Sequence, residues 1–282
     1  MTRTAAPARA CIIGWPVGHS RSPLIHGYWL QRYGLAGSYT RREVQPGDVA
    51  AFLRGMREEG FVGCNVTIPH KEAAFAAADR TTTAARAMGA ANTLWWEGDQ
   101  LFADNTDGLG FMNHLRASAP RFEAGGRLVA VLGAGGAGRG IVHALLEAGA
   151  AEVRLFNRTR ERAEAVARHF GARVRPCPWE ERVERSRDVA LLVNATSLGM
   201  HGQAPLVMPV AHLDPACIVY DLVYVPLATP LLAAARERGL LAVDGLGMLL
   251  HQAAPGFAKW FGVTPEVTDE LRALVAADIE GH

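Results

Sequence analysis

Residues 129–139 read Val129-Ala130-Val131-Leu132-Gly133-Ala134-Gly135-Gly136-Ala137-Gly138-Arg139, an apolar run that leads directly into a complete G-x-G-x-x-G pattern. This order predicts a strand, a tight turn and the start of a helix. Gly133 permits the turn, Gly135 lets the backbone approach a pyrophosphate, and Gly138 lets the helix pack closely on the strand. The first amides of the helix have no partner within it, and the helix dipole favours negative charge. The stretch therefore predicts dinucleotide binding.

The next predicted strand, at 153–156, indicates which dinucleotide. NAD-binding chains commonly carry Asp or Glu at the end of this strand, where the carboxylate binds the ribose hydroxyls. Here the strand is followed by Asn157-Arg158-Thr159-Arg160 and no acid. A guanidinium fork matches the geometry of a 2′-phosphate, whereas a carboxylate would repel it. We therefore expect NADP, with Arg158 as the first choice for its phosphate and Arg160 or Arg162 as helpers. The alternative is that some of these arginines only form the solvated face of the following helix.

Strand-like and helix-like segments alternate through the second half of the chain. We expect strands at 128–132, 153–156, 189–193, 218–222 and 240–243, and a crossover helix at 229–238. Such alternation is typical of a parallel, doubly wound sheet. Beyond Asp244-Gly245 the pattern becomes helical, with a helix at 248–260 and another that begins with Thr264 as N-cap and Pro265 in its first turn.

The first half of the chain also alternates. We expect strands at 10–13, 39–44 and 61–68, a helix at 22–30 and a hairpin formed by 92–96 and 101–103. The fold class is therefore α/β with two domains. An N-terminal α/β substrate domain spans 1–110 and is completed by 246–282, whose helices pack back on it. A Rossmann-type NADP domain spans 111–245.

Composition restricts the class of protein. The chain has 282 residues, of which 49% are hydrophobic and 20% charged, values typical of soluble globular proteins. A net charge of +1 points to neither a nucleic-acid nor a membrane partner. The four cysteines are far apart and none has C-x-x-C spacing, so we expect neither a metal site nor a disulfide framework. Free thiols suit the cytoplasm, and we expect a monomer or a homodimer.

Three polar segments punctuated by Gly or Pro follow strand-like runs in the first domain. They comprise residues 14–23, 65–71 and 104–108, and they contain His-Ser-Arg-Ser-Pro, Asn-Val-Thr-Ile-Pro-His-Lys and Asn-Thr-Asp-Gly. With Gly-Ala-Ala-Asn-Thr at 89–93, Asn-Ala-Thr-Ser-Leu-Gly-Met at 194–200 and Met-Leu-Leu-His-Gln-Ala at 248–253, the chain resembles the shikimate dehydrogenase family over nearly its whole length. The resemblance implies reversible NADPH-dependent reduction of 3-dehydroshikimate to shikimate, an oxidoreductase step of chorismate and aromatic amino-acid biosynthesis.

The resemblance also implies roles for individual residues. Ser20 and Ser22 match the family positions whose hydroxyls hold the substrate carboxylate, a task that suits hydroxyl donors at a helix start. Ser22 alone could equally be a helix cap. Asn65, Thr67, Asn92 and Gln252 match the family positions that hydrogen-bond the ring hydroxyls. Tyr224 stands just past a predicted strand end, where we expect it to close the substrate pocket. Each of the Asn and Thr residues could instead be a satisfied loop residue, and Tyr224 a core tyrosine.

Lys71 matches the catalytic lysine of the family and Asp107 matches its partner. Reduction of a ketone needs a proton at oxygen, and the reverse reaction needs a base for that proton. His70 is the rival acid or base by its intrinsic chemistry, but it stands at an unconstrained position of the motif, so we expect it to be a structural or a surface residue.

For the cofactor, the resemblance adds positions beyond the glycine loop. Asn157, Arg158, Thr159 and Arg162 correspond to the adenosine-phosphate side. The nicotinamide side corresponds to Thr196, Leu198, Leu222, Gly245 and Met248, although Met248 could equally fill the core.

Two departures and two alternatives accompany this interpretation. His26-Gly27 replaces the usual His-Asn pair, and Arg21 stands where an apolar residue is frequent. One alternative is a quinate/shikimate dehydrogenase with broader substrate or NAD use, against which Asn157-Arg158-Thr159 and the two hydroxyls at 20 and 22 argue. The other is a non-catalytic NADP-binding sensor, which would need no proton-transfer pair.

Overall fold

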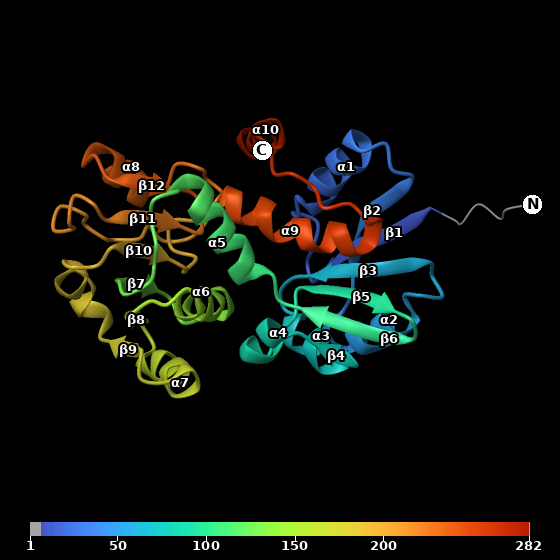
Figure 1. Ribbon diagram of the computed structural model, residues 1–282, viewed down its shortest axis with the longest axis horizontal. Coiled ribbons are helices and arrows are strands. Elements are labelled where there is room, and N and C mark those ends of the chain that lie inside the picture. Colours follow the sequence, from blue (N-terminus) through green and yellow to red (C-terminus); the bar gives the residue numbers. More distant parts are fainter. Residues whose placement is uncertain (1–6, 282) are drawn as a thin grey trace, which may run out of the picture. The chain divides into compact units, whose positions relative to one another are not determined.

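The computed structural model describes residues 7–281, and these divide into two compact units (Figure 1). The first unit extends to Thr106 and includes Leu250–Val275, and the second consists of Asp107–Leu249 with 276–281. The boundary between Leu249 and Leu250 falls inside one long helix, α9 (Leu246–Phe261), and that between Val275 and Ala276 falls inside α10 (Asp269–Glu280).

The first unit contains a six-stranded mixed sheet in the order β2-β1-β3-β5-β6-β4. Its strands are β1 (Ala8–Gly14), β2 (Gly37–Glu43), β3 (Phe61–Val66), β4 (Arg80–Thr81), β5 (Thr93–Glu97) and β6 (Gln100–Asp104). β1 runs parallel to β2 and β3, and β5 pairs with β6 as the antiparallel hairpin that the sequence predicted. Its helices are α1 (Ser22–Arg32), α2 (Val49–Gly55), α3 (Lys71–Ala77) and α4 (Thr83–Met88).

Apolar side chains cover both faces of this sheet. Alternate residues of a strand point to opposite sides, so each strand contributes to two clusters. Cys11 and Ile13 of β1 join one apolar cluster, whereas Ala10 and Ile12 join another that includes Trp260 of α9. Gly63 of β3 allows this packing, since a Cβ there would lie 2.1 Å from the Trp260 Nε1 atom and 2.2 Å from the Leu94 carbonyl oxygen.

The second unit is an all-parallel sheet in the order β12-β11-β10-β7-β8-β9. Its strands are β7 (Leu128–Leu132), β8 (Glu152–Phe156), β9 (Val174–Cys177), β10 (Leu191–Asn194), β11 (Ile218–Asp221) and β12 (Leu241–Val243). Its helices are α5 (Asp107–Ser118), α6 (Gly136–Glu147), α7 (Arg160–Phe170) and α8 (Pro230–Glu237), and short 3-10 turns occupy Trp179–Arg182 and Glu184–Ser186. The predicted doubly wound arrangement is thereby confirmed.

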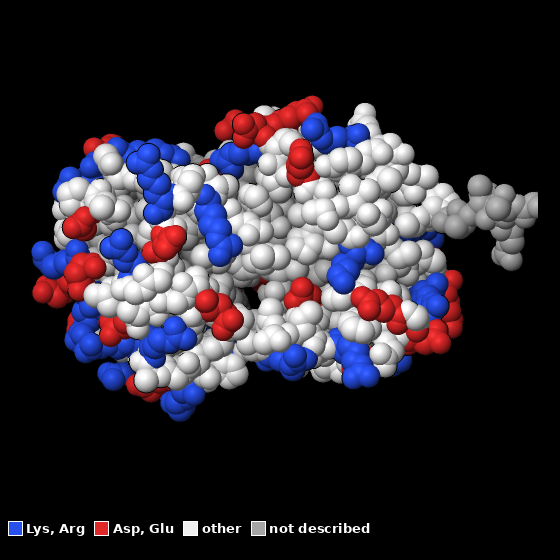
Figure 2. Space-filling view, viewed as in Figure 1, with Lys and Arg blue, Asp and Glu red and all other residues white. Residues whose placement is uncertain are grey.

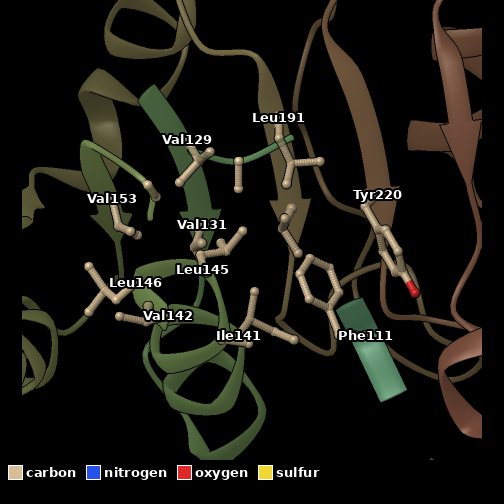
Figure 3. Close-up of a cluster of buried hydrophobic side chains, with 14 of the residues drawn as sticks. Phe111, Val129, Val131, Ile141, Val142, Leu145, Leu146, Val153, Leu191 and Tyr220 are labelled. Carbon is tan, nitrogen blue, oxygen red and sulfur yellow. The ribbon is translucent and has the colours of Figure 1, made fainter. Parts of the chain in front are cut away.

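The core of the second unit lies on both faces of the parallel sheet. Val129 and Val131 face the side covered by α6, while Ala130 and Leu132 face the opposite cluster, which contains residues of α8. Figure 3 shows the side chains of Ile141 and Leu145 from α6 directed at these strands. A continuous apolar strand such as 128–132 therefore reflects burial on both sides.

One expected helix start is wrong. Thr264 does not cap a helix, because α10 (Asp269–Glu280) begins five residues later and the hydroxyl of Thr268 accepts the Leu271 amide at 3.3 Å. Gly262, with φ +74°, ends α9. The segment that follows is held in a non-helical path, since the Trp29 indole donates to the Glu266 carbonyl at 2.9 Å.

Charges on the visible surface are mixed. Figure 2 shows Lys and Arg interspersed with Asp and Glu on that face. Within residues 7–281, no helix has the length and apolarity that crossing a bilayer requires. In the same range, no three His, Cys, Asp or Glu side chains gather as a metal site would require.

Candidate active site

Two of the side chains predicted to bind substrate, Asn65 and Asn92, belong to one hydrogen-bond network in the first unit. Asn65 lies near the end of β3, and its Nδ2 donates to the Asn92 carbonyl and to the Thr93 hydroxyl, both at 3.1 Å. A carbonyl can only accept, so these bonds fix which end of the Asn65 amide carries the nitrogen. The Tyr39 hydroxyl donates to Asn65 Oδ1 at 2.6 Å. Asn65 is therefore held from three sides.

Asn92 is the centre of this network. It is buried, and its Oδ1 accepts from the Thr106 amide at 2.9 Å, the Thr106 hydroxyl at 3.1 Å and the Thr93 hydroxyl at 3.0 Å. The Thr106 hydroxyl also contacts the Gln252 carbonyl oxygen at 2.9 Å. The structure thus brings Asn65, Asn92 and the backbone of Gln252 together.

Lys71 and Asp107 each stand next to a residue of this network. Lys71 begins α3, and its carbonyl oxygen accepts the amide of Ala91, the neighbour of Asn92, at 2.8 Å. Asp107 begins α5 directly after Thr106, and its side chain is buried, whereas Lys71 is half-buried. Lys71 is therefore bonded through its backbone to the residue before Asn92, and Asp107 follows a residue that the Asn92 side chain holds directly.

The two serines are linked to each other. The Ser22 amide donates to the Ser20 hydroxyl at 3.2 Å. Ser22 does not cap α1, since the N-cap position is Arg21 and its side chain makes no capping bond. Thr67 lies in the turn after β3, and its Cγ2 occupies space next to Gly14 that a Cβ at that position would fill.

Tyr39 is a site residue that the sequence reasoning missed. Burial raises its pKa well above the ordinary value, reinforced by the nearby thiols of Cys11 and Cys64 and opposed by a hydrogen bond with Ser22. Its hydroxyl therefore interacts with both Ser22 and Asn65. The signal available in the sequence was weak, because a tyrosine in a strand usually indicates packing.

The histidines near this network serve the structure. His70 is buried, and its Nε2 donates to the Val44 carbonyl at 2.7 Å, which confirms that it is structural. His26 is fully buried, and its ring stacks on Tyr39. Burial lowers the pKa of His26 to about 3, with the Asn65 side chain acting in the opposite direction.

A second set of predicted residues gathers in the second unit, at the carboxyl ends of its strands. Gly133 follows β7 with φ +105°, and a Cβ there would lie 2.9 Å from both the Ala195 carbonyl oxygen and Thr196 Cγ2. Gly138 packs so closely that its Cβ would lie 2.0 Å from the Gly133 carbonyl oxygen. The chain order reverses between β7 and β10, so these residues lie at the point where open α/β sheets bind ligands.

The start of α6 fits a phosphate group. Its N-cap, Gly135, provides no side-chain cap, and its first turn contains no acid. A Cβ at Gly135 or Gly136 would meet no atom within 4 Å, and Gly135, Gly136 and Ala137 are exposed. The first amides are therefore left to an external acceptor, and backbone alone forms the surface that approaches it.

The end of β8 presents the predicted 2′-phosphate residues. Asn157 Oδ1 accepts the Ala134 amide at 3.0 Å, and its Nδ2 donates to the Thr159 carbonyl at 2.7 Å, so Asn157 ties this loop to the glycine loop. Arg158 and Arg162 are exposed. Arg160 pairs with Glu164 at 2.8 Å, which confirms that some of these arginines belong to the solvated helix face.

The predicted nicotinamide-side residues follow β10, β11 and β12. The Leu222 amide donates to the Asn194 carbonyl at 2.9 Å, and a Cβ at Gly245 would lie 2.0 Å from the Leu222 carbonyl oxygen. Leu198 and Thr196 are joined by a 3.1 Å bond from the Leu198 amide to the Thr196 hydroxyl. Met248 is buried in the core cluster, and Tyr224 is half-buried just after β11.

Comparisons with known proteins agree with this arrangement. The model of the shikimate dehydrogenase substrate binding domain matches residues 12–94, that of shikimate / quinate 5-dehydrogenase matches 118–201, and that of the shikimate 5'-dehydrogenase C-terminal domain matches 245–274. A shikimate dehydrogenase (NADP(+)) of Azorhizobium caulinodans is 52% identical over 271 residues, which cover 96% of each chain.

Solved structures show the same fold. Shikimate 5-dehydrogenase from Thermus thermophilus, in complex with NADP(H) and shikimate, is 37% identical with a TM-score of 0.83, over 97% of this chain and 99% of that one. Quinate dehydrogenase from Corynebacterium glutamicum, in complex with NAD, is 27% identical with a TM-score of 0.89, over 96% and 99%. On the strength of the family models and the extent of identity, the chain belongs to the shikimate dehydrogenase family.

Proposed function

We propose that this chain catalyses the reversible NADPH-dependent reduction of 3-dehydroshikimate to shikimate, in the biosynthesis of chorismate and the aromatic amino acids. The observation that carries the proposal is that each unit contains its own built half-site. The first unit holds a hydrogen-bonded polar network around Asn92. The second unit has the uncapped amides at the start of α6 and the arginine Arg158 after the end of β8. The resemblance in sequence extends over both.

The substrate belongs to the part of the chain we assign as the substrate domain, 1–110 with 246–282. Ser20 and Ser22 hold its carboxylate, and Asn65, Thr67, Asn92 and Gln252 bind the ring hydroxyls, with Tyr224 contributing from the loop after β11. A network in which Asn65 and Asn92 are fixed by several bonds each presents its remaining polar atoms in one geometry, which favours recognition of a single polyol.

NADP belongs to the part we assign as the cofactor domain, 111–245, together with Met248. When bound, NADPH supplies a hydride to the carbonyl carbon. Gly133 to Gly138 hold the pyrophosphate at the start of α6, and Arg158 and Arg162, with Asn157 and Thr159, hold the 2′-phosphate side. Thr196, Leu198, Leu222 and Gly245 line the nicotinamide side.

Lys71 and Asp107 handle the proton. In reduction, the Lys71 ammonium gives a proton to the substrate oxygen as the carbonyl carbon becomes tetrahedral, and in oxidation the amine takes that proton back. Asp107 holds the Lys71 ammonium in place as its counter-ion. The protein acts as a monomer or a homodimer. The four cysteines are buried free thiols, which supports a cytoplasmic location.

The test is the absorbance of reduced nicotinamide, with purified protein and shikimate, in the presence of NADP or NAD. We expect turnover with NADP and a specificity constant for NADP well above that for NAD. Quinate replaces shikimate in a parallel assay, because the likeness to a quinate dehydrogenase makes that the second candidate. A larger specificity constant for quinate would make that candidate the function, and NADP binding without turnover would indicate a sensor.

A further inference from the structure

The carboxylate of Asp221 has no part in the proposed reaction, and it is buried next to the loops that we assign to the nicotinamide side. Asp221, at the end of β11, is 1% exposed, and it accepts three hydrogen bonds. Its Oδ1 accepts from Asn194 Nδ2 at 2.9 Å and from the Val223 amide at 3.0 Å, and its Oδ2 accepts from the Thr229 hydroxyl at 2.7 Å. A buried carboxylate is costly unless donors satisfy it. These three bonds offset that cost.

Asn194 is the next link. It is fully buried at the end of β10, and its Nδ2 also donates to the Leu198 carbonyl at 3.2 Å. Its Oδ1 accepts from both the amide and the hydroxyl of Thr196, at 3.1 and 2.7 Å. Both hydrogens and both lone pairs of the Asn194 amide are thus used. The Asp221 carboxylate only accepts, so it requires that the nitrogen of Asn194 faces it and that Oδ1 faces Thr196, and the Leu198 carbonyl and the Thr196 amide require the same orientation.

Thr196 connects Asn194 to the loop after β10 that contains Leu198. Its hydroxyl, held by Asn194, accepts the Leu198 amide at 3.1 Å, and its methyl group lies against Gly133. The bonds therefore form one path from Asp221 through Asn194 to Thr196 and Leu198. The same carboxylate holds the Val223 amide, so it also orients the loop that contains Leu222.

We infer that Asp221 is a positioning residue for NADP, which acts through the orientation of the Asn194 amide to hold the loop of Thr196 and Leu198 in its cofactor-binding geometry. The inference rests on the proposed function, since it takes NADP as the ligand. Asp221 itself does not contact the cofactor. Asp221 restricts the loop to one hydrogen-bonded arrangement before NADP binds. Binding then does not carry the entropy cost of ordering the loop.

The decisive variant is Asp221→Leu, which removes one of the two acceptors of the Asn194 Nδ2 and leaves the Leu198 carbonyl as the other. We expect the dissociation constant for NADPH, measured by nicotinamide fluorescence, to rise ten- to a hundredfold. The KM for shikimate at saturating NADP should rise less than the NADPH dissociation constant, because Asn65 and Asn92 belong to another network and, of the proposed substrate residues, Tyr224 lies next to Val223, whose amide Asp221 holds. Asp221→Asn should restore binding to within about threefold, since its oxygen can still face Asn194 while its nitrogen turns to the Thr229 hydroxyl.

Thr229→Val is the matched control. It removes one donor to the same carboxylate, and the cap of α8, without touching the bond between Asp221 and Asn194. We expect a lower melting temperature and an unchanged NADPH dissociation constant. If Thr229→Val weakens NADPH as much as Asp221→Leu does, Asp221 is only structural and the inference fails.

A second variant covers the case in which Asp221→Leu does not fold. Asn194→Ala removes the middle link and leaves Asp221 with Val223 and Thr229, and it should weaken NADPH at least tenfold. Unchanged NADPH binding in folded Asn194→Ala would overturn the inference. Because the readout is NADPH binding, this outcome is separate from a failure of the wild-type protein to oxidise shikimate, which would overturn the proposed function.

Discussion

The imidazole of His26 stacks on the ring of Tyr39, with centroids 4.0 Å apart and planes 12° from parallel. Trp29, Phe257 and Trp260 complete an aromatic enclosure around the imidazole. Within the described part of the chain, neither ring nitrogen of His26 has a hydrogen-bond partner. His26 is therefore uncharged at neutral pH. Its ring stacks on Tyr39, whose hydroxyl holds Asn65, so the protonation of His26 affects the stability of the substrate half-site.

The first prediction concerns acid stability. The pKa of His26 falls from 6.5 to about 3 on folding because of burial, so the unfolded chain takes up a proton that the folded chain does not. The stability that depends on neutral His26 is complete above pH 6.5 and is lost as the pH falls toward 3. This residue alone should cost about 2 kcal/mol between about pH 7.5 and about pH 5, at about 1.4 kcal/mol per pH unit.

The measurement is urea unfolding at a series of pH values for the wild type and His26→Phe. The variant should show a shallower pH dependence between about pH 6.5 and about pH 4, because the titrating group is gone. His143→Phe, which makes the same change at a histidine outside this enclosure, is the matched variant for comparison. Equal slopes for the wild type and His26→Phe would contradict the assignment.

The second prediction separates two glycines of one loop. Gly133→Ala should lower stability by about 1–3 kcal/mol, because φ +105° disfavours a side chain and the new methyl group would crowd Ala195 and Thr196. Gly135 has φ −78° and open space around its Cβ position, so Gly135→Ala should leave stability within about 0.5 kcal/mol. Gly135→Ala should nevertheless weaken NADP at least tenfold, since the methyl group would occupy the pyrophosphate position.

Thermal unfolding and NADPH titration of both variants provide the check. If Gly135→Ala binds NADP as the wild type does, the phosphate does not approach that backbone position.

The third prediction concerns proton transfer. Lys71→Ala should reduce kcat by about 10²–10⁴-fold, the usual contribution of a positioned acid or base, with a small change in the dissociation constant for shikimate. Asp107→Asn should lower kcat less, because the lysine remains. His70→Gln is the comparison, since the His70 ring bonds to the Val44 backbone, and it should affect stability more than turnover. Near-normal kcat in Lys71→Ala would remove the lysine from the mechanism.

The fourth prediction tests cofactor choice with two neighbouring arginines. Arg158→Gln should raise the KM for NADP at least tenfold and leave the KM for NAD nearly unchanged, because only NADP carries the 2′-phosphate. Arg160→Gln should change either value less than threefold, since Arg160 is paired with Glu164 on α7. Steady-state kinetics with both cofactors measures the ratio, and equal effects of the two substitutions would assign the preference to overall charge.

The fifth prediction concerns the thiols. Cys11, Cys64, Cys177 and Cys217 are buried, and burial raises the pKa of Cys177 and raises that of Cys217 to about 12. A thiol reagent that reacts with thiolates should therefore modify the native protein very slowly and label all of these groups only after unfolding. Rapid labelling of any one of them in the native protein would show that the segment around it opens readily.

The sequence by itself determined the parts that depend on local pattern. The run 128–132 with Gly133, Gly135 and Gly138 predicted the strand, turn and helix start, because strand periodicity and glycine conformational freedom are local properties. The hairpin at 92–103 and the crossover helix α8 were predicted for the same reason. The family motifs then located Asn65 and Asn92, which the structure joins.

Only the tertiary structure decided those elements for which the local sequence gives conflicting indications of secondary structure or none. β9 contains Pro176, which argues against a strand, and it exists because it lies at the edge of the sheet, where a missing amide costs little. The start of α10 moved to Asp269 because the segment before it is fixed by Trp29 of α1 and by Tyr33 in the turn after that helix. Tyr39, Asp221 and Asn194 gained their roles from partners 26 or 27 residues away in the chain. Burial and hydrogen-bond satisfaction depend on such distant partners, and no local pattern encodes them.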